Sequence, residues 1–87
     1  MNAKQTKTLK DIFHNPAKSS VLWSDIENLF RAYGATIEEG SGSRVCIILN
    51  GVVAVFHRPH PQKETDKGAL KSVRHFLRNA GVKYDEL

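Results

Sequence analysis

The sequence has little of what secretion, membrane insertion or disulfide formation would need. It contains one cysteine, so no internal disulfide can form. Because Cys46 lies within an apolar run, a buried thiol is expected rather than a nucleophile or a metal ligand. No stretch reaches the roughly 18 apolar residues of a membrane span, and the polar, basic start of the chain does not resemble a signal peptide. We therefore expect a cytoplasmic protein without membrane association.

Acidic side chains are also in the minority. Nine Asp and Glu residues face 13 Lys and Arg residues, which gives a net charge of +4 with neutral histidines. This excess favours a polyanion or an acidic protein as partner without choosing between them. A chain of 87 residues buries only about 60 to 65% of its unfolded surface, which predicts a single compact core.

The clearest local signal is Asn50-Gly51 between two β-rich runs. Both residues tolerate the positive φ that a two-residue type I′ turn requires. Counting outward from this turn pairs residues 44–49 with residues 52–57 and sets Arg44 opposite His57. A cation and an imidazole are therefore predicted to face each other on neighbouring strands.

Two helices are expected before this hairpin. A short one from about Leu9 to His14 resembles an appendage, and Asn15-Pro16 ends it because the residue before proline disfavours helix. Ser24 and Glu27 have the spacing of a capping box. This pattern predicts a helix over residues 25–33, which Gly34 terminates.

A short strand over residues 35–38 and a final helix complete the expected fold. After a polar link over residues 59–64, Thr65 or Asp66 can cap a helix that runs to about Ala80. The resulting order predicts an α+β two-layer sandwich, with a three-stranded antiparallel sheet packed against the two longer helices. The chain ends, residues 1–8 and 83–87, are expected to be flexible.

The final helix carries a row of cations, which we call the basic ridge. Its members recur at steps of four, three and four residues, and they are Lys67, Lys71, Arg74 and Arg78. The row is either an ordinary solvated helix face or a surface for the phosphates of a nucleic acid. The absence of any acid in the helix after Asp66 favours phosphate contact.

The loop Gly40-Ser41-Gly42-Ser43 precedes Arg44. It is either a solvent loop or a site where backbone amides and the two serine hydroxyls contact a phosphate. It lacks the Gly-Lys-Ser/Thr of a P-loop, which gives nucleotide hydrolysis little support. Arg44 could bind phosphate or protect a strand edge, and Arg58 could add positive charge or simply mark the exit from the strand.

His57 and His60 are the histidines that the pattern places near this loop. Two imidazoles without a converging cysteine or carboxylate fall short of a metal site, so no metal or other cofactor is expected. An imidazole opposite an arginine suits RNA cleavage, in which a base takes the proton of the ribose 2′-OH and a cation stabilises the phosphorane-like oxyanion. The candidate catalytic residues are therefore His57, Arg44 and His60, and the candidate RNA-binding residues are Ser41, Ser43, Arg58 and the basic ridge.

From about Trp23 to Val82, the chain resembles the HicA toxins, small mRNA interferases of bacterial toxin-antitoxin pairs. The resemblance rests on an ordered set of segments: Ala32-Tyr33-Gly34-Ala35, the Gly-Ser loop, Asn50-Gly51, Arg58-Pro59-His60-Pro61 and Asn79-Ala80-Gly81-Val82. It implies a fold like that of double-stranded-RNA-binding domains, metal-independent endoribonuclease activity on mRNA, and neutralisation by a HicB-type antitoxin. It also divides the chain into an extension (1–22), a HicA-like domain (23–82) and a tail (83–87).

One departure from the family pattern bears on catalysis. The resemblance implies a catalytic histidine shortly after the Gly-Ser pair, but Arg44 follows Gly42-Ser43 here. Either His57 has taken over proton transfer, or the chain binds RNA with reduced cleavage. A third reading is a protein-interaction domain whose basic surface contacts an acidic partner. His60 matches the family's His-Pro pair, which could also serve structure or antitoxin docking.

Overall fold

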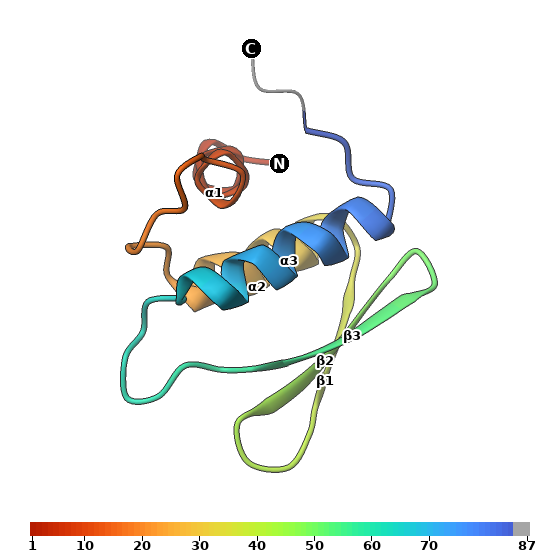
Figure 1. Cartoon of the computed structure of the whole chain (residues 1–87). Coiled ribbons are helices and arrows are strands. Elements are labelled where there is room, and N and C mark those ends of the chain that lie inside the picture. The colour runs from red at the N-terminus through yellow and green to blue at the C-terminus, as the bar shows by residue number, and fades with distance from the viewer. Residues whose placement is uncertain (85–87) are drawn as a thin grey trace.

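The computed structural model describes residues 1–84 and contains three helices and one antiparallel sheet. The elements, in chain order, are α1 (Ala3–Ile12), α2 (Trp23–Ala32), β1 (Thr36–Glu39), β2 (Arg44–Leu49), β3 (Val52–His57) and α3 (Lys67–Asn79). The strands lie side by side in the order β1-β2-β3, which is also their order along the chain. The predicted α+β architecture is confirmed, and it fits the general fold of double-stranded-RNA-binding domains (Figure 1).

The β2–β3 hairpin has the predicted register. Asn50 and Gly51 have φ values of 51° and 79°, as a type I′ turn requires. Arg44 pairs with His57 at the far end of the hairpin, as predicted. β1 begins and ends one residue later than expected, and its Ile37 pairs with Ile47 of β2.

One face of the sheet is buried and the other is open. Val45, Ile47 and Leu49 alternate along β2 with the less buried side chains of the opposite face. The inward side chains pack beneath α2 and α3, which lie together over that face, while α1 lies on the opposite side of the helical layer from the sheet (Figure 1). This arrangement leaves the outer face of the sheet free of any helix among residues 1–84.

The first helix is longer than expected. It begins at Ala3 because the side chain of Asn2 accepts from the backbone N–H of Gln5 while the Gln5 side chain accepts from that of Asn2. Residues 3–8 are therefore helical, and the prediction that they are flexible is wrong. The usual capping-box pattern does not predict this reciprocal cap, because Asn2 stands in place of Ser or Thr.

The predicted capping box at Ser24 is wrong. α2 begins at Trp23, its N-cap is Leu22, and no side chain caps it. The Glu27 carboxylate accepts hydrogen bonds from the side chains of Trp23 and Arg58 and not from the backbone N–H of Ser24. At the final helix, by contrast, Asp66 accepts from the N–H of Ala69 and provides the expected cap.

The N-terminal extension is part of the core and not an appendage. Leu9, Ile12 and Phe13 are each at most 8% exposed and belong to the same apolar cluster as α2 and α3. Phe13 also stacks on Tyr84, with 5.1 Å between ring centroids. The rest of the predicted flexible tail, residues 85–87, lies outside the described part of the chain.

None of the helices in residues 1–84 has the length and apolar character that crossing a bilayer requires.

Candidate functional site

Arg44 and His57 meet on the open face of the sheet. They are Cα partners at the end of the hairpin that is distant from its turn, and both side chains are exposed. Counting from the turn places them in a non-hydrogen-bonded pair, the type in which opposing side chains approach more closely. Towards the turn, the same face continues with Cys46 and Val55, which are paired with each other. The arginine and the imidazole therefore share the polar end of a largely apolar surface.

The Gly-Ser loop lies directly beside this pair. The N–H of Gly40 donates to the carbonyl of Arg44 at 2.9 Å, and the N–H of Arg44 donates to the carbonyl of Ser41 at 3.2 Å. The N–H of Arg58 donates to the Ser43 carbonyl at 2.8 Å, which extends the β2–β3 pairing by one step. The loop is thus a hydrogen-bonded turn that presents the exposed Ser41 and Ser43 next to Arg44.

Two glycines shape this turn. Gly42 has a φ of +61°, which favours a residue without a side chain. A Cβ added to Gly40 would lie 3.2 Å from both the Cβ and the carbonyl oxygen of Arg44, closer than most real contacts. Glycine at these positions therefore lets the turn pack tightly against the start of β2.

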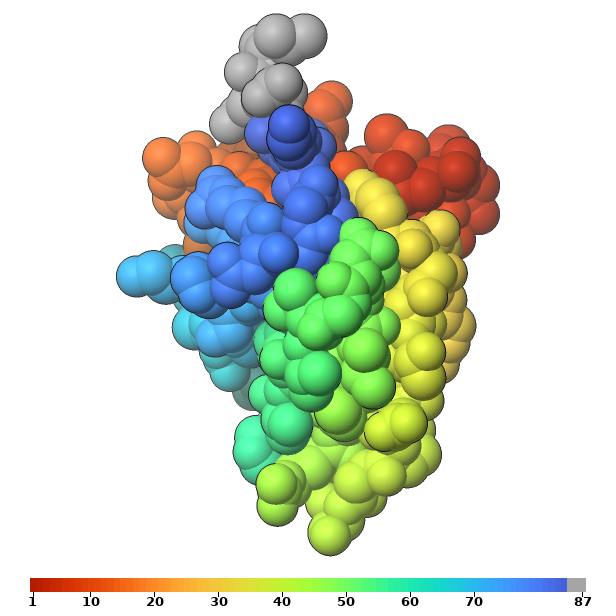
Figure 2. Space-filling model, turned by 90° about the vertical axis from the view of Figure 1, so that its right-hand side faces the viewer, coloured from red at the N-terminus to blue at the C-terminus, as the bar shows by residue number. Residues whose placement is uncertain are grey.

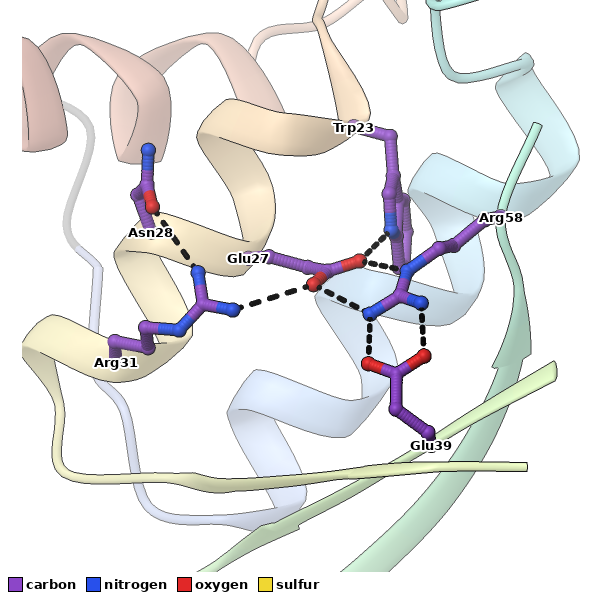
Figure 3. Close-up of polar contacts among 6 residues, drawn as sticks. All are labelled: Trp23, Glu27, Asn28, Arg31, Glu39 and Arg58. Atoms are coloured by element: carbon purple, nitrogen blue, oxygen red, sulfur yellow. Dashed lines mark hydrogen bonds and ion pairs between the residues drawn. The ribbon is translucent and has the colours of Figure 1, made fainter. Parts of the chain in front are cut away.

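Arg58 lies at the centre of an ion-pair network on the inner side of the site (Figure 3). Its guanidinium donates to Glu27 at 2.7 Å from Nε and 3.0 Å from Nη2. It also donates to both oxygens of Glu39, with 2.8 Å between Nη2 and Oε2. Trp23 donates its indole N–H to the same Glu27 carboxylate. Two carboxylates thus already occupy the guanidinium that was expected to bind RNA.

The network sets the protonation of its members. Burial tends to raise the pKa of Glu27, but hydrogen bonds from Arg58 and Trp23 and the positive charges outweigh it, so this pKa lies below its ordinary value. Hydrogen bonding to Arg58 also lowers the pKa of Glu39. Hydrogen bonds to the two carboxylates raise the pKa of Arg58 above its ordinary value. Arg58 therefore joins α2, β1 and the end of β3 as a permanent cation.

The basic ridge is divided between two environments. Arg74 donates through Nε to the carbonyl of Ile12 and through Nη2 to that of His14 at 2.8 Å. The guanidinium of Arg78 lies over the ring of Phe13, 5.1 Å from its centroid. These two arginines hold the end of α1 against α3. Lys67 and Lys71 are exposed and have no ion-pair partner within residues 1–84.

His60 lies in the exposed segment that follows β3. Within residues 1–84, no hydrogen bond joins its side chain to Arg44 or His57. In the same part of the chain, no three His, Cys, Asp or Glu side chains are grouped as metal ligands. Cys46 is half-buried on the open face of the sheet, so the expectation of a fully buried thiol is wrong.

Sequence reasoning missed the Glu27–Arg58 contact and the anchoring of α1 by Arg74. The spacing of Trp23, Glu27 and Phe30 gave a signal, since an acid at this spacing lies on the apolar face of the helix and needs a partner. No comparable signal existed for Arg74, because its partners are backbone carbonyls of a distant segment.

Comparison with known proteins gives a match to a family model. The family model described as HicA toxin of bacterial toxin-antitoxin matches residues 23–82. Neither the curated proteins nor the solved structures gave a match. The matched range begins with α2 and ends just after α3, so it includes the sheet, the Gly-Ser loop and the basic ridge but not α1. The chain belongs to the HicA toxin family of bacterial toxin-antitoxin systems.

Proposed function

We propose that this chain is a toxin that cleaves mRNA by a metal-independent route and thereby inhibits translation. The observation that carries the proposal is the exposed pair of Arg44 and His57 beside the Gly-Ser turn. Membership of the HicA toxin family supports it. The pair combines an imidazole, which exchanges protons near neutral pH, with a cation that binds phosphate.

The proposed reaction uses the nucleophile that RNA itself carries. His57 accepts the proton of a ribose 2′-OH, and the 2′ oxygen attacks the adjacent phosphorus. The O2′–P bond forms and the P–O5′ bond breaks, which leaves a 2′,3′-cyclic phosphate and a 5′-hydroxyl end. Arg44 stabilises the negative charge that develops on the phosphoryl oxygens. His60, in the exposed segment after β3, is proposed to return a proton to O5′.

The remaining proposed contacts position the RNA. The exposed hydroxyls and amides of Ser41 and Ser43 suit the phosphate next to the scissile bond. Lys67 and Lys71 project freely from α3 and suit backbone phosphates further along the strand. Arg74 and Arg78 add positive charge to this surface while they hold α1. Because Arg58 pairs with two carboxylates and so joins α2, β1 and the end of β3, we assign it a structural role and not phosphate binding.

A non-catalytic RNA-binding module is the second candidate. It is favoured by Arg44, which stands where the resemblance implies a catalytic histidine. In that case the basic surface would retain RNA without cleaving it. A third candidate, a domain that binds only an acidic protein, would use the same surface without RNA. In the first reading, the neutralising partner is a HicB-type antitoxin; membership of a toxin-antitoxin family supports an antitoxin partner.

The test is incubation of the purified chain with a long single-stranded RNA in EDTA. We compare the wild type with His57→Ala and Arg44→Ala, and with the matched controls His14→Ala and Lys10→Ala. These control residues lie on or next to α1, on the other side of the helical layer from the sheet. The proposal expects fragments with cyclic-phosphate and 5′-hydroxyl ends, which both site variants abolish and both controls retain.

Three other results would point elsewhere. Intact RNA that is nevertheless retarded on a native gel, with a steep loss of affinity as salt rises, would support the binding module. If the RNA is neither cleaved nor retarded, the result would support the protein-interaction domain. Cleavage at the normal rate by His57→Ala would remove His57 from the mechanism.

A further inference from the structure

In the described part of the chain, the free edge of β3 presents unpaired backbone groups. β3 is the last strand of the sheet, with β2 on one side and no strand on the other within residues 1–84. The two-residue turn makes Val52 the first residue that bonds to β2, and the bonding residues then alternate. The bond from the N–H of Arg58 to the carbonyl of Ser43 continues this alternation. Val53, Val55 and His57 therefore direct their N–H and C=O groups away from the sheet.

This edge lacks the usual protection. Natural sheets protect their edges with charged residues, proline, bulges or very short strands. β1, the opposite edge, has four residues and carries Glu38 and Glu39. β3 has six residues in unbroken register, and Val53 and Val55 on its outer face are 60% and 52% exposed. A long, regular and apolar edge of this kind favours the addition of another strand.

A groove with a positive wall runs along the same edge. It has a volume of about 590 Å³ and lies between residues 52–56 of β3 and the side of α3. On the α3 side it is lined by Lys71, Arg74, His75 and Arg78. No acidic residue lies between Lys67 and Asn79, so the wall is of one sign. Figure 2 shows the hairpin, in green, beside the blue C-terminal part of α3.

We infer that this groove binds an extended acidic segment of a partner protein, which adds to β3 as a fourth strand. Main-chain hydrogen bonds to Val53, Val55 and His57 would hold it. Because strand side chains alternate, every second residue of the segment faces the wall of α3, and the others continue the outer face beside Val53 and Val55. The matching sequence is therefore an alternation of acidic and apolar residues over about six positions.

Charge and hydrogen bonding favour this occupant over others. A second copy paired edge to edge would add a chain of charge +4 to a groove that is already positive. RNA offers phosphates to the cations but no row of N–H donors for the carbonyls of β3. It would also leave the apolar side chains of Val53 and Val55 exposed to solvent. An acidic β segment satisfies the backbone, the cations and the apolar face together.

The inference goes beyond RNA cleavage and can fail independently of it. A bound segment would cover Lys71 and lie beside His57, so it would exclude RNA from part of the proposed surface. Binding and cleavage are measured separately, which keeps the two proposals distinguishable.

The probe is a synthetic peptide of alternating glutamate and valine with blocked ends, titrated into the isotope-labelled full chain. We expect the amide hydrogens of Val53, Val55 and His57 to exchange at least about tenfold more slowly at saturation. The amides of Val52 and Ala54 are already bonded to β2 and should change little. A peptide with lysine in place of glutamate, and one N-methylated at alternate residues, should both fail to bind.

Variants test the two parts of the site. Val55→Pro removes an outward N–H without removing a bond to β2, whereas Val55→Thr keeps that N–H. Lys71→Glu reverses one charge of the wall, with Lys10→Glu on α1 as its control. We expect Val55→Pro and Lys71→Glu to weaken peptide binding by about tenfold or more, and the two controls to retain it. If Val55→Pro fails to fold, Lys71→Glu and the N-methylated peptide still decide the question.

Three outcomes would overturn the inference. Unchanged exchange at the three outward amides would exclude strand addition at this edge. Protection that grows with protein concentration without peptide would identify a second copy as the occupant. Protection by RNA, but not by the acidic peptide, would assign the groove to nucleic acid.

Discussion

Replacing Arg58 with methionine should destabilise the fold by leaving a buried carboxylate without its main partner. The side chain of Glu27 is 8% exposed, and Arg58 donates two hydrogen bonds to it. Orphaning one member of a fully buried ion pair costs about 3 to 5 kcal/mol. Here Arg58 is 31% exposed, and Trp23 still donates to Glu27, so solvent and the indole offset part of the loss.

We therefore expect Arg58→Met to lower the free energy of unfolding by about 2 to 3 kcal/mol at neutral pH. For a domain of this size, that is a fall in Tm on the order of 10 to 20 °C. Arg31→Met is the matched control, because Arg31 approaches the same carboxylate at 3.6 Å but is 56% exposed. It should cost less than about 0.5 kcal/mol.

The pH dependence separates this mechanism from a simple loss of packing. In the wild type, the pKa of Glu27 is lower in the folded than in the unfolded state. This difference stabilises the fold at pH values above the ordinary pKa of glutamate, and the contribution is lost as the pH falls through the lower pKa of the folded state. Without Arg58, the pKa of Glu27 is higher than in the wild type, because the hydrogen bonds and positive charge of Arg58 no longer oppose the effect of burial. The gap in stability between wild type and Arg58→Met should therefore narrow as Glu27 becomes protonated.

The measurement is urea unfolding at about pH 7 and about pH 3.5, on either side of the ordinary carboxyl pKa. The fluorescence of Trp23, the single tryptophan, reports on the network, and far-UV circular dichroism reports on the whole fold. A loss below about 0.5 kcal/mol, or a gap that stays the same at both pH values, would refute the reasoning.

Substitutions at three further positions test other contacts. Thr65→Val should stabilise the fold by about 1 kcal/mol in thermal unfolding, because the Thr65 hydroxyl is buried and no group in residues 1–84 forms a hydrogen bond with it. A loss of stability would reveal a hidden partner. Arg74→Met should speed hydrogen exchange of the α1 amides while leaving those of the sheet unchanged, since two of its hydrogen bonds hold the end of α1. Asn50→Ala should lower the free energy of unfolding by about 1 to 2 kcal/mol in urea. It places alanine at a φ of 51°, which is unfavourable for that residue, and it removes the 2.7 Å hydrogen bond from the Asn50 side chain to the Ala80 carbonyl. Asn50→Gly should cost less, since it removes only the bond.

Local sequence determined the hairpin completely. Asn50-Gly51 fixes the turn, the turn fixes the register, and the register places Arg44 opposite His57. These steps involve neighbours in the chain, so pattern and backbone preference suffice. Helix starts were less predictable because competing caps have similar local energies: Asn2 formed a box with Gln5, while Ser24 did not cap α2.

Tertiary structure decided which of the predicted cations remain available. Arg58 and Glu27 are 31 residues apart in the chain, and Arg74 reaches carbonyls about 60 residues away, so no local pattern could pair them. Only the packing of α2 against the sheet, and of α1 against α3, brings these groups within bonding distance. The sequence by itself therefore determined the architecture and the Arg44–His57 pair, because both follow from short-range backbone geometry. The tertiary structure decided the role of each arginine and left one edge of the sheet open, because those depend on which distant segments come into contact.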